Sequence, residues 1–546
     1  MPRGAIPQRG MAGDRADLRD SYSPLVGLVY IFNLIVGTGA LTMPAAFKDA
    51  GWALSLAIVI LLALMSYLTT TFVIEAMAST NALVHGKTLK HYKRVVGEEE
   101  GHIAEGRKEY MANELRTDEI IARSVDLDER VPLLISNAAE SMEESSHVDY
   151  FAIKERFELG KMASLYFNKL GINLFYICIA IYLYGDLAIY AAAVSKSLRD
   201  VTCTARTTVP NVTNGSAKDM GDLQCWSGAE VSRTDAYRIY VLAFLCLLGP
   251  FTFFNMQKTK YLQLFTTLMR WIAFSSMIIL CTIALSGGKG RGQPPVADPT
   301  GLPNLFGVCV YAFMCHHSLP SLVTPMKSKR HLFALVGADY LLILGFYTLL
   351  AFTGIFTFPR LHDMYTLNFQ PTDDPLGSIV PAIPFLQYFL SLFPVFTLST
   401  SFPIIAITLR NNLKALFLRE ERSSSSSPTS SVASSTTAAP STLYKILERF
   451  LLPLLAILPP IIVAFATENV EFLVGITGSY AGAVIQYIVP VALVYCARNQ
   501  VFETLGLGVR NQHASVFRHS AWLVFVLLWA VTCVTFVTVN HFLSKF

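Results

Sequence analysis

Long runs of apolar residues recur along the chain and set its architecture. A helix needs about 20 consecutive apolar residues to cross a bilayer core, and such runs recur from residue 24 to residue 542. They predict an all-α polytopic membrane protein with about 11 transmembrane helices. The predicted spans are residues 24–47, 52–77, 170–194, 237–254, 261–285, 305–324, 332–358, 379–409, 443–466, 472–496 and 521–542.

Polar segments separate these spans. Residues 1–22 form a predicted cytosolic tail. Residues 78–165 are rich in Glu, Lys and Arg, and residues 420–442 are almost entirely Ser, Thr, Pro and Ala. Neither segment can bury enough apolar surface to order itself, so both are predicted to be disordered cytosolic loops. The spans then fall into three groups, at 23–77, 166–419 and 443–546.

Composition narrows the possible functions. Hydrophobic residues make up 53% of the chain and charged residues 15%, whereas soluble domains carry about 25% charged residues. A net charge of +4 is too small to indicate a nucleic-acid partner. The sequence contains no P-loop, zinc or hydrolase motif. We therefore expect a protein in contact with membrane lipid, with no enzymatic activity, resident metal or organic cofactor.

Basic residues in the short loops predict the orientation. Arg and Lys follow the predicted sixth span at 327–330 and the eighth at 410–422, and Arg recurs between the tenth and eleventh at 498–518. Cytosolic loops carry such an excess of Lys and Arg. With a cytosolic N-terminus all three loops are cytosolic, and the C-terminus is lumenal or extracellular.

The loop at 199–235 falls on the non-cytosolic side in this orientation. It contains Cys203 and Cys225, which flank two glycosylation triplets that begin at Asn211 and Asn214. Disulfides and N-glycans both belong to oxidising, non-cytosolic compartments. We therefore predict a Cys203–Cys225 disulfide and glycosylation at both asparagines.

A sorting motif is predicted in the first polar loop. Glu129 stands four residues before the pair Leu133-Leu134, which resembles the acidic dileucine signal that clathrin adaptors bind. Such a signal predicts an endosomal or lysosomal membrane. The alternative is a chance match, which leaves the plasma membrane equally open.

The predicted first helix is interrupted in its middle. Gly37 and Gly39 each weaken a helix by about 1 kcal/mol relative to Ala, and Pro44 lacks the amide that the preceding turn needs. Unwound backbone in a membrane must be buried or line a cavity, where it can bind ions or substrate. The alternative is close helix packing by small residues, which the glycines alone would favour.

The predicted sixth helix has a matching interruption. Cys315, His316, His317 and Pro320 break an otherwise apolar run. Broken helices at corresponding places in two halves of a chain indicate the binding site of a secondary transporter. The pair therefore favours transport over packing.

The sequence motifs at these places resemble those of the amino acid/auxin permease family. Gly-Thr-Gly-Ala-Leu-Thr-Met-Pro at 37–44 is similar to that family's first helix, and Cys-His at 315–316 with Leu-Pro at 319–320 to its sixth. Residues 401–410 and 475–490 resemble its eighth and tenth helices. Residues 184–190 and 248–254 resemble one animal subgroup, which has no firmly assigned substrate.

The resemblance implies the inverted-repeat fold of a bacterial leucine transporter, with 5+5 helices, breaks in helices 1 and 6 and an added eleventh helix. It implies amino acid transport driven by sodium or protons. The implied substrate-binding residues are Val36, Gly37, Thr38, Gly39, Phe313, Cys315 and His316. The implied sodium ligands are Asn33, Val36, Thr400 and Ser401.

Asp186 in the third span and His316 are candidates for carrying a coupling proton. The alternative for Asp186 is a structural ion pair or hydrogen bond, for example with Arg270 in the fifth span. A second function is also open, since the long cytosolic loop fits an amino-acid sensor or scaffold that transports little.

Overall fold

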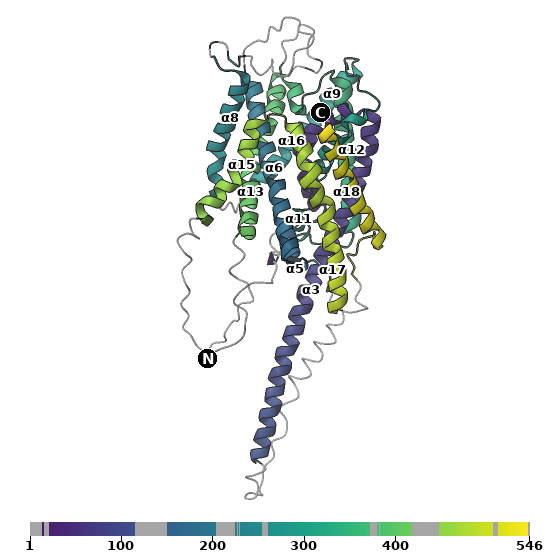
Figure 1. Ribbon diagram of the computed structural model, residues 1–546. Coiled ribbons are helices and arrows are strands. Elements are labelled where there is room, and N and C mark those ends of the chain that lie inside the picture. The colour runs from purple at the N-terminus through teal and green to yellow at the C-terminus, as the bar shows by residue number, and fades with distance from the viewer. Residues whose placement is uncertain are drawn as a thin grey trace.

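The computed structural model is almost entirely helical (Figure 1). It describes residues 14–15, 21–114, 150–203, 224–226, 228, 230–253, 260–371, 379, 381, 383–417, 447–505 and 511–543. Glu129, Leu133, Leu134, Asn211, Asn214 and the Ser-rich linker at 420–442 lie outside these residues.

The first half of the described chain runs from a short strand to the fifth long helix. Its elements are β1 (Asp14–Arg15), α1 (Pro24–Ile35), α2 (Thr38–Ala50), α3 (Trp52–Glu114), β2 (Glu155–Arg156), α5 (Leu159–Tyr166), α6 (Lys169–Thr202), α8 (Arg233–Leu248), the 3-10 helix η3 (Gly249–Phe253) and α9 (Lys260–Ser286). Polar side chains begin several of these helices, because they accept bonds from amides that lack a partner in the first turn. Asn168 Oδ1, for example, accepts from the Gly171 amide at 2.8 Å.

The second half contains two interrupted regions. Its elements are η4 (Pro299–Gly301), α10 (Leu302–Ala312), α11 (Leu319–Val323), α12 (Leu332–Thr357), η5 (Tyr365–Phe369), α13 (Pro384–Phe417), η7 (Leu447–Leu451), α15 (Leu452–Ala466), α16 (Val470–Thr477), η8 (Gly478–Gly482), η9 (Val484–Ile488), α17 (Val489–Leu505) and α18 (Ser520–Leu543). The elements η4 and η5 are 3-10 helices, and η7, η8 and η9 are π-helical.

Nine helices in the described part of the chain are long and apolar enough to cross a membrane, and the bent pair α1–α2 brings the number to ten. The prediction of an all-α polytopic membrane protein is therefore confirmed. The predicted sixth span corresponds to α10 and α11, which a non-helical stretch at 313–318 separates.

The core is centred on α10, which is buried along its length. It packs against α2, α16 and η8, and α12 covers α2 from another side. Glycines permit the closest of these contacts, because a Cβ at Gly307 would lie 2.0 Å from the Gly475 carbonyl oxygen. Gly478 permits an equally close contact, since a Cβ there would lie 1.9 Å from the Gly307 carbonyl oxygen.

The predicted disordered loop at 78–165 needs correction at both of its ends. The helix α3 does not end near residue 77 but continues to Glu114, and it projects beyond the rest of the bundle (Figure 1). The returning chain from residue 150 is also ordered, with Phe151, Ile153 and Phe157 buried. Residues 155–156 pair antiparallel with 14–15 as the strands β2 and β1.

Asn81 is the physical reason for the order of the returning chain. Its side-chain Oδ1 accepts from the Lys154 and Glu155 amides at 3.2 and 2.9 Å. Its Nδ2 donates to the Met77 and Glu155 carbonyls at 3.0 and 3.2 Å. The Asn81 side-chain amide thereby takes the place of the backbone partners that a neighbouring strand would supply. The charge content of residues 78–165 gives no indication of this interaction.

We predict that Asn81→Ala destabilises the folded state by about 1–3 kcal/mol, because it leaves four backbone groups without this partner. The measurement is the unfolding temperature of the purified protein in detergent. Asn412→Ala is the matched control, since Asn412 donates to the Thr408 carbonyl of its own helix. An equal effect of the two changes would contradict the role assigned to Asn81.

Candidate binding site at two helix breaks

The first break separates α1 from α2. The helix α1 ends at Ile35, α2 begins at Thr38, and the two axes differ by 55°. Gly37 stands at the N-cap of α2 and offers no side-chain oxygen to the first amides of that helix. The first amides of a helix have no partner within the helix, so the amides of Thr38 and Gly39 are available to a ligand.

The second break lies beside the first. The helix α10 ends at Ala312, and a Cβ added to Gly39 would stand 2.6 Å from the Ala312 Cα. The two backbones are therefore in contact at the point where both helices are interrupted. Gly37 differs, because the nearest atom to an added Cβ there is the Ile35 carbonyl oxygen at 4.0 Å.

One tyrosine joins the two breaks. The Tyr347 hydroxyl on α12 lies 2.9 Å from the Ile35 carbonyl oxygen and 3.0 Å from that of Ala312. Its single proton is shared between these two carbonyls, which lack the amide partners that an uninterrupted helix would provide. Ser66 on α3 does the same for the second break by donating to the Phe313 carbonyl at 3.1 Å.

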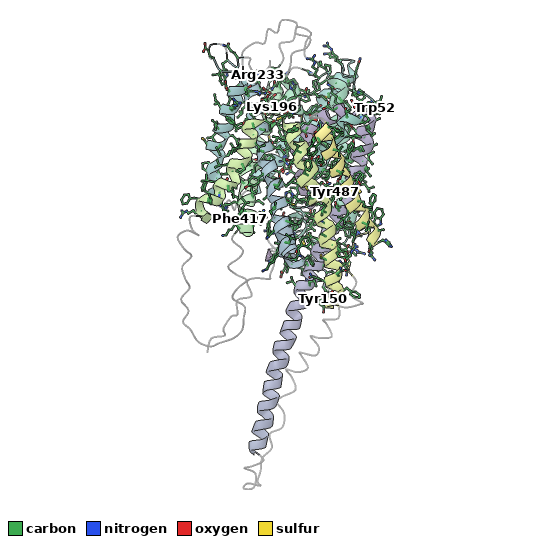
Figure 2. The ribbon with its side chains drawn as sticks, viewed as in Figure 1. Trp52, Tyr150, Lys196, Arg233, Phe417 and Tyr487 are labelled. Carbon is green, nitrogen blue, oxygen red and sulfur yellow. A yellow bond between two sulfur atoms is a disulfide. The ribbon has the colours of Figure 1, made fainter. Side chains whose placement is uncertain are left out.

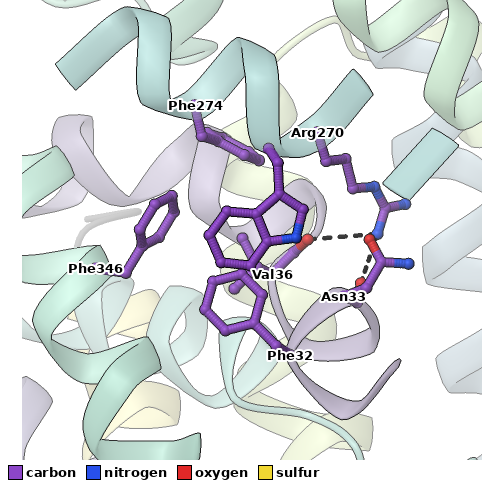
Figure 3. Close-up of a pocket in the computed structure, with 7 residues that line it drawn as sticks. Phe32, Asn33, Val36, Arg270, Phe274 and Phe346 are labelled. Atoms are coloured by element: carbon purple, nitrogen blue, oxygen red, sulfur yellow. Dashed lines mark hydrogen bonds between the residues drawn. The ribbon is translucent and has the colours of Figure 1, made fainter. Parts of the chain in front are cut away.

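Arg270 on α9 satisfies the remaining carbonyls of the first break. Its Nη1 donates to the Asn33 carbonyl at 2.7 Å and to the Val36 carbonyl at 3.3 Å (Figure 3). Aromatic side chains wall this place, and the cavity that remains is about 10 Å³, room for about one water molecule. The cavity is lined by Phe32, Asn33, Val36, Arg270, Trp271, Phe274 and Phe346.

The predicted sixth-helix residues divide into two groups. Phe313 lies near the first break, with its ring 5.3 Å from that of Tyr347. Cys315 and His316 instead contact the polar face of α3 and α12. His316 Nε2 lies 2.9 Å from Thr69 Oγ1, and Cys315 Sγ lies 3.3 Å from the Tyr340 hydroxyl.

The predicted sodium ligands already take part in hydrogen bonds within the protein. The Asn33 and Val36 carbonyls accept from Arg270, as described. The Thr400 and Ser401 hydroxyls donate to the Thr397 carbonyl of their own helix, at 2.9 and 3.1 Å. No hydrogen bond within the described part of the chain joins these two hydroxyls to α1.

Asp186 on α6 is buried beside the same centre. Tyr311 on α10 is hydrogen-bonded to its carboxyl group, whereas no ion pair between Asp186 and Arg270 forms in the described structure. The expected alternative, a structural hydrogen bond, is thus met by Tyr311 and not by Arg270. Asp186 Oδ1 has no hydrogen-bond partner among the described residues and remains available to a ligand, whereas the Thr38 hydroxyl lies beside that of Tyr190.

Charged clusters stand toward the two ends of the bundle. At one end Lys196 contacts Asp363 at 2.7 Å, and Arg199 pairs with Asp200 and Glu468 (Figure 2). Toward the end where Tyr150 lies, Arg498 on α17 forms a two-bond ion pair with Glu75 on α3, both bonds at 2.8 Å. The Glu75 Oε2 also accepts from the Ser515 amide at 2.9 Å.

The structure contains the Cys203–Cys225 disulfide, which closes the loop at the Lys196 end of α6. Three groups at the breaks were not predicted from the sequence as part of the site. Ser66 and Tyr347 stand in ordinary apolar runs and gave no signal. Arg270 did give one, because a charge so deep in a span is rare.

We predict that Gly39→Ala lowers the unfolding temperature while Gly37→Ala leaves it nearly unchanged. The Cβ at position 39 must displace the Ala312 backbone, which costs about 1–3 kcal/mol. The Cβ at position 37 meets open space. Thermal unfolding of the two variants side by side checks this, and equal losses would contradict the proposed contact between the breaks.

Comparison with known proteins places the chain in a family. A model described as "Transmembrane amino acid transporter protein" matches residues 20–115 and 134–536. The chain is 49% identical to Transmembrane protein 104 of Homo sapiens, over 98% of this chain and 99% of that protein. Identity is 44% to the Drosophila melanogaster homolog, over 96% of this chain and 97% of that protein.

A more distant homolog, from Dictyostelium discoideum, is 33% identical over 97% of this chain and 98% of that protein. The human and fly relatives represent the animal subgroup that residues 184–190 and 248–254 resemble. The printed names of these relatives state no substrate. From the match along nearly its whole length, the chain belongs to the transmembrane amino acid transporter family.

Proposed function

We propose that this protein is a secondary transporter of amino acids, driven by a sodium or proton gradient. Its helices would form a 5+5 inverted repeat with an eleventh helix added, and the substrate would bind between the α1–α2 and α10–α11 breaks. The observation that carries the proposal is the contact of two interrupted helices at Gly39 and Ala312, with free amides beside it.

The chemistry of the first break suits a carboxylate. The N-terminus of α2 carries a partial positive charge and unpaired amides, and the Thr38 hydroxyl lies beside them, next to that of Tyr190. The neighbouring carbonyls already accept from Tyr347 and Arg270. Backbone amides are therefore free to donate to an anion, whereas the neighbouring carbonyls already accept hydrogen bonds. The Phe313 ring offers an apolar contact to the side chain of a substrate.

Transport also requires the site to open to each side in turn. The cavity beside the first break has room for about one water molecule, so the site must widen before it can take up a substrate. The Lys196–Asp363 pair and the Arg498–Glu75 pair stand on opposite sides of the site. In our proposal each pair breaks when its own side opens.

A sensor or scaffold is the second candidate function. The observation in its favour is α3, a single helix of 63 residues that extends beyond the bundle. Such a helix offers a surface to a cytosolic partner. A sensor would bind an amino acid at the same breaks but would carry none across the membrane.

Uptake by proteoliposomes distinguishes the two functions. We expect gradient-driven uptake of at least one radiolabelled amino acid by the wild type. Tyr347→Phe should slow it about tenfold, because two carbonyls lose their shared donor. Tyr495→Phe is the matched control, since Tyr495 is 57% exposed, and it should transport at the wild-type rate.

A ligand-induced rise in unfolding temperature, measured on the same preparations, completes the design. Binding without uptake would replace the transporter by the sensor. Neither binding nor uptake, across all common amino acids and with sodium and proton gradients, would contradict both functions.

We further propose that the protein is glycosylated at Asn211 and Asn214 and reaches endosomes or lysosomes. The disulfide at Cys203 and Cys225 supports a non-cytosolic loop around both sequons. The Glu129, Leu133 and Leu134 motif would bind a clathrin adaptor. Imaging should show the double change Leu133→Ala and Leu134→Ala moving the protein to the plasma membrane, and an unchanged distribution would contradict the sorting role.

A further inference from the structure

The first break contains a resident cation. Family resemblance assigns the Asn33 and Val36 carbonyls to a sodium ion, but the Arg270 Nη1 donates to both of them. The guanidinium comes from a different helix, α9, and thereby ties α9 to the end of α1 (Figure 3). A bound metal ion would make the same link by accepting lone pairs from the same two oxygens.

Backbone groups around the Arg270 guanidinium balance its charge as they would balance that of a bound ion. Arg270 is half-buried, and no carboxylate among the described residues forms an ion pair with it. Buried charges are normally paired. The carbonyls at the C-terminal end of α1 carry the negative end of the helix dipole, and those of Asn33 and Val36 accept from the guanidinium directly.

A second cation cannot share this place. Two unit charges about 4 Å apart at an effective dielectric constant of about 20 repel strongly enough to weaken binding roughly a thousandfold. The eighth-helix hydroxyls assigned to sodium, on Thr400 and Ser401, bond within α13. The Asn33 and Val36 half of the expected sodium site, which already holds the Arg270 charge, is therefore not set to receive an ion.

We propose that the Arg270 guanidinium permanently takes the position of a coupling sodium ion, so that this protein needs no sodium at the first break. The inference rests on the proposed function for its meaning in transport, but the occupancy of the two carbonyls can be tested without it. Arg270 is a positioning residue in this account, because it fixes the carbonyl ends of α1 and holds the adjoining amides of α2 in place.

The primary test is thermal unfolding of the purified full-length protein in sodium chloride and in potassium chloride at equal ionic strength. We expect the same unfolding temperature in both salts for the wild type and for Arg270→Lys, which keeps a cation at the carbonyls. In Arg270→Ala the carbonyls are vacated, and sodium should raise the unfolding temperature by about 2–4 °C over potassium.

Arg410→Ala is the matched control. Arg410 also donates to a backbone carbonyl, that of Thr252 at 2.8 Å, but away from the break. We expect it to show no difference between the two salts. A sodium-specific rise in the wild type or in Arg270→Lys would overturn the proposal. So would a folded Arg270→Ala that responds equally to both salts, and if Arg270→Ala does not fold the other two proteins decide.

A second readout connects the inference to transport. Uptake by the wild type should be unchanged when choline replaces sodium on both sides of the membrane, whereas tenfold slower uptake would overturn the proposal. Absence of uptake in every condition counts against the proposed function alone, because the unfolding temperatures in the two salts still decide the role of Arg270.

Discussion

Backbone carbonyls freed inside a membrane must find donors, and the centre of this protein is arranged around that constraint. Two helices stop in the bilayer, and each leaves carbonyl oxygens that water cannot reach. Tyr347 donates to one carbonyl from each break, Arg270 donates to two more, and Ser66 donates to another. Three different helices supply these donors. The breaks are thus held open by their neighbours and are not left to refold into continuous helices.

The same arrangement distinguishes the carbonyl oxygens of the unwound backbone from its amide groups. Acceptors are consumed by side chains of the protein, whereas the first amides of α2 have no side-chain cap. In the proposed function this backbone would bind the carboxylate of a substrate, whereas Asp186 Oδ1 remains available to a donor. It also ties the position of α1 to α9 and α12, so a movement of either helix alters the first break directly.

Much of this arrangement could be predicted from sequence, because glycine and proline act locally. Gly37 stands between α1 and α2, and Pro320 stands in the first turn of α11, by effects that need no knowledge of neighbours. The paired cysteines also lie close in sequence. The distant partners could not be predicted. Tyr347 lies more than 300 residues from Ile35, and in the sequence nothing distinguishes it from the other residues of its apolar span.

The failures have the same cause. The order of residues 150–157 depends on Asn81, and a charge-rich composition gives no sign of one buried amide that satisfies a returning strand. Cys315 and His316 belong to the predicted motif, yet their side chains are held by α3 and α12. Burial and pairing between distant segments decided these positions, and local composition does not encode them.

The continuity of α3 has a mechanical consequence. At 1.5 Å per residue the helix is about 95 Å long, and about 40 Å of it lies beyond Gly86, where its apolar portion ends. A rigid rod pivoted in the bundle amplifies small rotations at its far end. A 10° tilt of the embedded part would carry residue 114 sideways by about 7 Å, which turns a rearrangement around Glu75 and Ser66 into a displacement that a distant protein could register.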